Sequence, residues 1–412
     1  MTPSATSRLD TDAVRAAFPI LHQNVHGHPL TYLDNASTTQ KPQCVIEAMA
    51  RYYRSDHANV GRGMHALADR AAHAVENARV LLQQHVGATE ASEIVFTAGA
   101  TAALNLLAYS YGMSFVKKGD EVLVTQMEHH ANFLPWQRLC SQTGAEFKIC
   151  PVTASGQLDI EALEQLITAK TKIVAVTYVS NVLGTINPIQ RIVSRAHVHG
   201  AVVVVDAAQA LAHLSLNVAE LGCDFMVFSA HKAYGPTGVG ALYGKKALLE
   251  IMAPYQVGGN TVEHVELHTC TYADIPNRFE AGTLPLASIV GWAEALRWIQ
   301  QAGYATLSTH EDQLLQRAVA LLSEIPGVQL VDVAEPRMGI LAFNVQNVHP
   351  TDVGLLLDAR GIAVRTGHCC AQPLLAALEQ PGGVVRVSLA AYNTHEEVDL
   401  LAKSVHCLAR SV

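Results

Sequence analysis

The chain has 412 residues, of which 50% are hydrophobic and 16% are charged. This composition excludes disorder, and the length favours two unequal domains because α/β domains often exceed about 150 residues. The net charge of −8 and the scattered basic residues argue against nucleic acid or a membrane as a partner and favour a small-molecule substrate.

Targeting and redox features point to a cytoplasmic protein. The first 18 residues carry acidic and basic side chains without the apolar segment of an export signal. No apolar run reaches the roughly 18 residues that a membrane helix needs. The eight cysteines show no CxxC spacing, which favours reduced thiols, and only Cys369 and Cys370 are adjacent.

Short apolar runs alternate with helix-like stretches between residues 90 and 245, which predicts an α/β domain with a mostly parallel sheet. The predicted strands are 94–97, 122–125, 172–179, 201–205 and 225–228. Runs such as 202–205 are continuous, as in strands covered by helices on both faces. Polar side chains follow these runs, and ligands bind at the carboxyl edge of such a sheet.

The C-terminal part predicts a smaller α+β domain. Its expected helices cover 288–301 and 310–322, and its expected strands cover 340–345, 363–365 and 384–388. We expect an N-terminal segment, 1–35, that packs with this domain, a large domain, 36–285, and the small domain, 286–412. No low-complexity linker separates the parts, so a cleft is expected between them.

The strongest chemical signal is Lys232, which follows a buried strand and precedes a glycine-rich turn. A partly desolvated amine loses proton affinity and can act as a nucleophile toward an aldehyde and then as a base. Asp206 and Gln209 emerge at the same sheet edge, where a carboxylate can keep a pyridinium nitrogen protonated, as pyridoxal phosphate requires. Taken alone, the lysine could be a surface residue and the aspartate a helix cap.

Two further segments fit the same kind of ligand. Gly99-Ala100-Thr101 precedes a helix predicted to begin near Ala102, so its amides could bind a phosphate, although many ordinary helices begin this way. His129 follows the strand 122–125 and supplies a flat ring for stacking. Adjacent histidines without a third ligand argue against a metal. The glycine spacing 235, 238, 240 does not match a dinucleotide fingerprint, which excludes a nicotinamide site.

Residues 365–373 form a loop-like segment with two thiols. Arg365 and His368 flank the thiols, and cationic neighbours lower the pKa of a thiol. Arg365 or the later Arg386 could also bind a substrate carboxylate through two hydrogen bonds. A functional role is expected for Cys370, whereas a small buried side chain is expected at Cys44, Cys140, Cys150, Cys223 and Cys407.

The ordered motifs closely resemble the class V aminotransferase-like family of pyridoxal phosphate enzymes. They are Glu128-His-His-Ala-Asn132, Ser180-Asn-Val-Leu-Gly184, Asp206-Ala-Ala-Gln209, Ser229-Ala-His-Lys232 and Arg278-Phe-Glu-Ala-Gly-Thr283. The resemblance extends from Tyr32-Leu-Asp-Asn-Ala36 to Tyr392-Asn-Thr-His-Glu-Glu397, and the short loop 365–373 is similar to the SufS/CsdA (group II) type of cysteine desulfurase. It implies the pyridoxal phosphate transferase fold of type I, with the cofactor in the large domain and the catalytic cysteine loop in the small one.

The resemblance also implies residue roles. Lys232 would carry pyridoxal phosphate as a Schiff base, with His129 on its ring, Asp206 at the ring nitrogen and Gln209 at the phenolic oxygen. The phosphate would lie against Ala100, Thr101, Ser229 and His231, with Thr283 reaching it from the partner subunit of a homodimer. The substrate would lie against Asn181, Arg386, Arg365 and Ala36. Cys370, directly before Ala371-Gln-Pro373, matches the catalytic cysteine.

The implied reaction converts L-cysteine to L-alanine. Lys232 would take the Cα proton, and Cys370 would receive the sulfur as a persulfide and pass it to a SufE-like acceptor protein for iron–sulfur cluster assembly. A selenocysteine lyase acting on L-selenocysteine is the enzyme alternative. A non-catalytic sulfur-transfer scaffold is the alternative of another class, but retention of Lys232, Asp206, His129 and Cys370 argues against it.

Several positions depart from the family pattern. Cys369 stands where the SufS/CsdA type usually has a histidine, which makes it a candidate resolving or alternative thiol, and a disulfide between adjacent cysteines is strained. Gly61 replaces a histidine, Ala98 and Ala102 replace charged residues beside the phosphate segment, and Ala207 replaces a glycine. These changes bear on turnover and acceptor docking but spare the expected cofactor residues.

Overall fold

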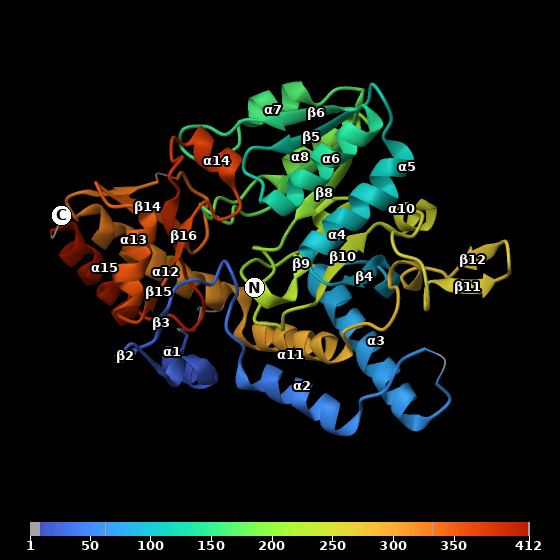
Figure 1. The fold of residues 1–412 in the computed structure, drawn as a ribbon, viewed down its shortest axis with the longest axis horizontal. Coiled ribbons are helices and arrows are strands. Elements are labelled where there is room, and N and C mark those ends of the chain that lie inside the picture. The colour runs from blue at the N-terminus through green and yellow to red at the C-terminus, as the bar shows by residue number, and fades with distance from the viewer. Residues whose placement is uncertain (1–8, 62, 332, 411–412) are drawn as a thin grey trace, which may run out of the picture.

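The structure, a computed structural model, describes residues 9–61, 63–331 and 333–410. A seven-stranded sheet lies at its centre, with the strand order β4-β10-β9-β8-β7-β5-β6 and helices on both faces (Figure 1). Its strands are β4 (Ile94–Thr97), β5 (Glu121–Thr125), β6 (Glu146–Cys150), β7 (Thr171–Thr177), β8 (Val202–Asp206), β9 (Phe225–Ser229) and β10 (Gly240–Gly244). Strand β10 pairs antiparallel with both β4 and β9, and all other pairings in this sheet are parallel. The predicted α/β fold class is therefore confirmed.

The central strands are apolar on both faces because each face packs against a different core cluster. In β8, Val203 and Val205 pack in one cluster and Val204 in the other, as the two-residue period of a strand requires. The helices around this sheet are α2 (Gln43–Ser55), α3 (Ala66–Val86), α4 (Ala100–Leu107), α5 (Met113–Phe115), α6 (Leu134–Thr143), α7 (Ile160–Leu166), α8 (Ile189–Val198), α9 (Val218–Leu221), α10 (Lys246–Ile251) and α11 (Leu286–Ala302).

A second, four-stranded antiparallel sheet has the order β13-β14-β17-β16 and lies beside the first (Figure 1). Its strands are β13 (Val328–Leu330), β14 (Ile340–Val345), β16 (Arg365–Gly367) and β17 (Val384–Ser388). The helices of this part are α12 (Tyr304–Ser323), α13 (Pro350–Asp358), α14 (Gln372–Ala377) and α15 (His395–Ala409). Helix α15 begins with a capping box, in which Thr394 and Glu397 each bind the other's backbone amide.

The N-terminal segment reaches across to this second part of the chain. Strand β3 (Thr31–Tyr32) pairs in parallel with β15 (Ile362–Ala363). The remaining short elements are α1 (Thr11–Ala16), β1 (Asn24–Val25), β2 (His28–Pro29) and a projecting hairpin of β11 (Val262–Val265) and β12 (Cys270–Tyr272). Residues 1–8 of the predicted N-terminal segment and 411–412 of the predicted small domain lie outside the described residues.

Two local predictions are wrong for reasons of tertiary context. The strand expected at 363–365 is two strands, because β15 pairs with the N-terminal β3 whereas β16 pairs with β17. The helix expected near Ala102 begins at Ala100, directly after Gly99. Within the described ranges, no helix is both long and apolar enough to cross a membrane.

Candidate active site

A cavity of about 470 Å³ lies at the carboxyl edge of the seven-stranded sheet and extends to the segment after β16. Every predicted site residue except Thr283 lines it. These residues are Ala36, Ala100, Thr101, His129, Asn181, Asp206, Gln209, Ser229, His231, Lys232, Arg365, Cys370 and Arg386. Residues almost 350 positions apart in the sequence thus face one space, as the sheet-edge argument predicts.

Lys232 lies in a short 3-10 turn directly after β9, and its side chain is partly buried where it lines the cavity. Burial lowers the pKa of this amine to about 8, against an opposing effect of Asp206, which ends the neighbouring β8. Burial also raises the pKa of the Asp206 carboxyl, whose Oδ1 accepts a hydrogen bond from the amide of Ala208 at 3.0 Å. The site therefore holds an amine with a lowered pKa and a carboxyl with a raised pKa, both facing one cavity.

His129 presents a neutral ring to the cavity. Burial lowers its pKa to about 4, and the nearby Lys232 acts in the same direction. Its Nδ1 accepts a hydrogen bond from the amide of Ala131 at 3.0 Å, so the ring proton of the neutral form is on Nε2. The preceding Glu128 is fully buried and accepts hydrogen bonds from Thr125 and Asn132, which fixes the turn that carries His129.

The first turn of α4 forms an anion-binding end of the cavity. The N-cap residue of this helix is Gly99, which has no side chain to cap it, and Ser229 Oγ accepts a hydrogen bond from the amide of Ala100 at 3.0 Å. Gly99 has a φ of 149°, and a side chain at Gly240 would meet the Gly99 backbone at 2.5 Å, so two glycines allow this close approach. Amides at a helix N-terminus with Thr101 beside them suit a phosphate.

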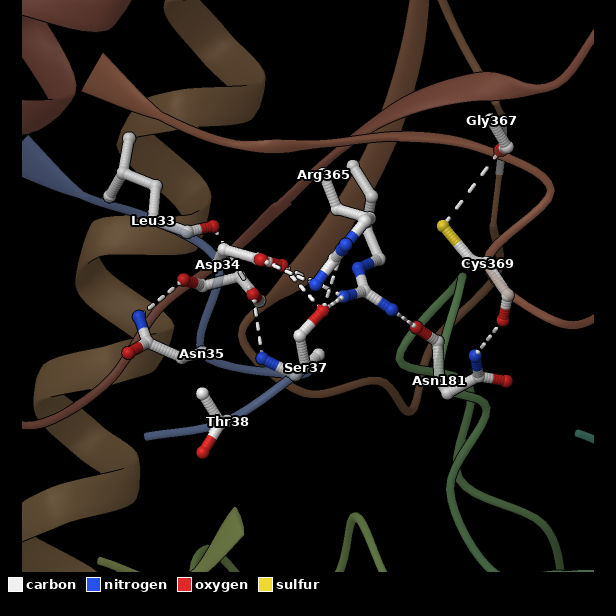
Figure 2. A network of polar contacts seen from close by, with 12 residues as sticks. Leu33, Asp34, Asn35, Ser37, Thr38, Asn181, Arg365, Gly367 and Cys369 are labelled. Carbon is white, nitrogen blue, oxygen red and sulfur yellow. Dashed lines mark hydrogen bonds and ion pairs between the residues drawn. The ribbon is translucent and has the colours of Figure 1, made fainter. Parts of the chain in front are cut away.

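Two arginines share one acidic partner at the other end of the cavity, as Figure 2 shows around Asp34. Arg386 Nη2 lies 3.1 Å from Asp34 Oδ1, and Arg365 Nη2 lies 3.0 Å from Asp34 Oδ2. Both guanidinium groups also donate to Ser37 Oγ. The Nε of Arg386 is buried without a hydrogen-bond partner in the structure, so this arginine has capacity for a further anionic group.

Asn181 connects the arginines to the thiol loop. Its backbone carbonyl accepts from Arg386 Nη1 at 2.8 Å, and its side-chain amide donates to the carbonyl of Cys369 at 2.7 Å (Figure 2). The next carbonyl, of Cys370, accepts from the amide of His130 at 2.8 Å. The ring Nε2 of His130 accepts from the amide of Gln372 at 3.3 Å. The loop is therefore held at consecutive peptide groups.

Sequence reasoning did not assign Asp34, Ser37 or His130 a role. Asp34 lies inside the motif 32–36 that carries the resemblance, but its two arginine partners are more than 300 residues away in the sequence. Gln209 donates to the carbonyl of Ala36 at 2.8 Å, which joins two predicted residues. Thr283 lies away from the cavity and donates to Asn59 at 3.4 Å.

The donor set fits pyridoxal phosphate. A lysine with a lowered pKa is present for the aldehyde, a buried aspartate for a pyridine nitrogen, a neutral imidazole for the ring and a helix N-terminus after Gly99 for the phosphate. Within the described residues, no group of three or more histidine, cysteine, aspartate or glutamate side chains could hold a metal ion.

Comparisons with known proteins agree with this geometry. The aminotransferase class-V family model matches residues 31–401. A probable cysteine desulfurase of Halalkalibacterium halodurans is 45% identical, with 96% of this chain and 97% of the relative covered. A probable cysteine desulfurase of Mycobacterium leprae is 47% identical over 97% of this chain, which spans 65% of that relative's length. The crystal structure of the Escherichia coli cysteine desulfurase CsdA is similar at a TM-score of 0.91, with 37% identity and coverage of 98% and 99%.

The chain belongs to the class-V aminotransferase family, and it is a pyridoxal phosphate enzyme of fold type I. The similarity to proteins named cysteine desulfurase confirms the resemblance that the sequence motifs indicated.

Proposed function

We propose that this chain is a cysteine desulfurase that converts L-cysteine to L-alanine and receives the sulfur as a persulfide on Cys370. The observation that carries the proposal is the meeting of three kinds of group at one cavity. These are the amine of Lys232, the guanidinium of Arg386 and the exposed thiol of Cys370. The amine of Lys232 and the guanidinium of Arg386 suit an amino-acid substrate, and the thiol of Cys370 is the group that accepts the sulfur.

The cofactor residues have distinct tasks in this proposal. Lys232 Nζ would bind the aldehyde, Asp206 would hold a proton at the ring nitrogen, and the neutral ring of His129 would pack against the ring. Ala100, Thr101, Ser229 and His231 would bind the phosphate, and Gln209 would contact the phenolic oxygen. When bound, pyridoxal phosphate supplies an electron sink for the charge left after the Cα proton departs.

Substrate binding places the reacting atoms. The carboxylate pairs with Arg386, whose Nε lacks a partner, and Asn181, Arg365 and Ala36 lie beside it. The amine of Lys232, when it is not attached to the cofactor, would take the Cα proton of the substrate. The low pKa of Lys232 favours this role because the unprotonated form is well populated near pH 8.

Sulfur transfer is carried out by Cys370. Its thiolate attacks the substrate sulfur, so that an S–S bond forms and the Cβ–S bond breaks. The electron pair of the broken bond stays with the substrate carbon, which takes a proton and becomes the methyl group of alanine. The sum is L-cysteine plus the Cys370 thiol giving L-alanine plus the Cys370 persulfide.

The proposal includes partners, location and domain limits. Exposure of Cys370 supports delivery of the sulfur to a SufE-like acceptor protein for iron–sulfur cluster assembly. A homodimer is supported by Thr283, which lies outside the cavity of its own chain and could serve a partner's site. A cytoplasmic location suits a mechanism that needs a reduced thiol. The separate four-stranded sheet and the β3–β15 pair support the division into 1–35, 36–285 and 286–412.

Labelled substrate tests this proposal. The holoenzyme is mixed with L-cysteine that carries a heavy sulfur isotope, without reductant, and its peptides are mapped by mass spectrometry. The expected result is one labelled sulfur atom on the Cys370 peptide together with free alanine. Alanine without labelled protein would instead support direct elimination of the sulfur, and labelled protein after Lys232→Ala would exclude the lysine's proposed role.

A further inference from the structure

The cavity is lined by two thiols of different exposure. Cys370 is exposed, whereas the adjacent Cys369 is partly buried and packs against the main apolar core. Both residues line the same cavity as Lys232 and Arg386. The proposed reaction uses only the outer thiol, so the inner thiol is a nucleophilic group without an assigned task.

The backbone between the thiols is held in place. The carbonyl of Cys369 accepts from Asn181, and the carbonyl of Cys370 accepts from the amide of His130. Both cysteines have left-handed φ values, 50° and 54°. On the other side, Gly383 approaches Gly367 so closely that a side chain there would meet its backbone at 2.7 Å. These contacts hold the loop at both cysteine carbonyls and at Gly367.

A fixed backbone disfavours a disulfide between these neighbours. Adjacent Cα atoms are about 3.8 Å apart, below the roughly 4.4–6.8 Å range of most disulfides. Bonding would require the two Sγ atoms to approach to about 2 Å. Transfer of an outer persulfide sulfur requires less movement. During the transfer, the outer sulfur atom of the persulfide lies between the two Sγ atoms. The Sγ atoms are then roughly 4 Å apart, which is the sum of two S–S bonds.

Two arginines partly offset the burial of Cys369. Burial raises the pKa of its thiol, Asp34 and Cys370 act in the same direction, and Arg386 and Arg365 oppose the rise. The same two guanidinium groups would stabilise a negatively charged persulfide at this position. The apolar packing on the other side limits access of water and external thiols.

We propose that Cys369 is a second sulfur-holding residue, which takes the persulfide sulfur from Cys370. The proposal rests on the desulfurase function proposed above. The Cys369 thiolate attacks the outer sulfur of the Cys370 persulfide, a new S–S bond forms on Cys369 and the S–S bond on Cys370 breaks. The electron pair remains on Cys370 Sγ, which takes up the proton that Cys369 lost. Neither an oxidant nor a reductant is consumed.

A stoichiometric consequence follows, because Cys370 is again a free thiol after the transfer. The enzyme can then process a second L-cysteine before any acceptor or reductant arrives. Each chain therefore forms two alanine molecules in the absence of both, and stores one sulfur atom on each of Cys369 and Cys370.

Rapid-quench measurement of alanine tests this count. The holoenzyme is mixed with excess L-cysteine without reductant or acceptor, and alanine is counted per cofactor-loaded chain. We expect a burst of two alanines in the unmodified enzyme and one in Cys369→Ser, a twofold difference. Cys270→Ser is the matched control at an exposed cysteine on β12, and its burst should remain two.

Other results would overturn the inference. A burst of one alanine per chain in the unmodified enzyme, or of two alanines per chain in Cys369→Ser, would overturn it. Peptide mapping of the unmodified enzyme gives a reading that does not depend on a variant, and a Cys369–Cys370 disulfide with released sulfide would exclude storage. Steady-state alanine formation with a reductant separates the two proposals. If the unmodified enzyme forms no alanine even then, the desulfurase function itself has failed.

Discussion

The buried ion pair between Arg79 and Glu280 should be one of the most sensitive points of the fold. Its side chains are 2% and 1% exposed, and two Arg79 nitrogens lie 2.7 and 2.9 Å from the Glu280 carboxylate. The pair also makes hydrogen bonds to the backbone at the free edge of β4, the end strand of the sheet. Arg79 donates to the carbonyl of Ile94 at 2.8 Å, and Glu280 accepts from the amide of Phe96 at 2.6 Å.

Replacing Glu280 with glutamine keeps the shape of the side chain but removes the buried counter-charge of Arg79, which keeps its ion pair with the exposed Glu76 at 3.2 Å. Loss of one buried partner destabilises a protein by about 3–5 kcal/mol, and the remaining pair with Glu76 places this variant at the lower end, about 3 kcal/mol. We expect a decrease of that size in the free energy of unfolding, measured by urea denaturation of the holoprotein. Because β4 leads into the phosphate end of the site, cofactor affinity measured by absorbance titration should also fall.

An exposed pair provides the control. Arg317 and Asp399 form two hydrogen bonds of 2.6 and 2.7 Å, but their side chains are 43% and 46% exposed. Solvent screens such a pair, so Asp399→Asn should leave the urea midpoint almost unchanged. If Glu280→Gln and Asp399→Asn shifted the midpoint equally, the reasoning from burial would be refuted.

Three further predictions concern the site. Gly383→Ala should displace the thiol loop through its 2.7 Å contact with Gly367 and slow alanine formation while cofactor absorbance is kept; Gly382→Ala, which meets nothing within 4 Å, is the control and should be neutral. The rate of cofactor attachment to the apoprotein should rise with pH and level off above about 8, because burial lowers the pKa of Lys232 and only the unprotonated amine attacks. A rate that kept rising toward 10.5, the ordinary lysine value, would contradict this. Asp206→Asn should slow alanine formation by at least about a hundredfold with cofactor still bound, measured by single-turnover quench, and a smaller effect would exclude stabilisation of the ring proton.

The sequence predicts those features that depend on local patterns. Continuous apolar runs locate the central strands, and β4, β14 and β17 have the predicted limits. The rule that ligands bind at the carboxyl edge then brings Asp206, Lys232 and His129 together before any coordinates are known. The signal for these site residues is a polar residue at or directly after the end of an apolar strand, and this pattern can be recognised in the sequence alone.

Features that depend on contacts between distant segments are not predictable in this way. The split of 363–365 into two strands is set by β3, more than 300 residues earlier. The shared acidic partner Asp34 and the anchoring of the thiol loop by His130 likewise arise from tertiary contacts. Gly383 gives no local signal beyond a turn, and its role is visible only because Gly367 lies against it.

The most direct test of the account compares alanine formation from L-cysteine by the unmodified protein and by Cys370→Ala, with a thiol reductant present. The account predicts sustained alanine formation by the first and loss of it in the second, with the cofactor absorbance retained in both. Equal activity of the two proteins would contradict the persulfide mechanism on Cys370, and absence of alanine in both would contradict desulfuration.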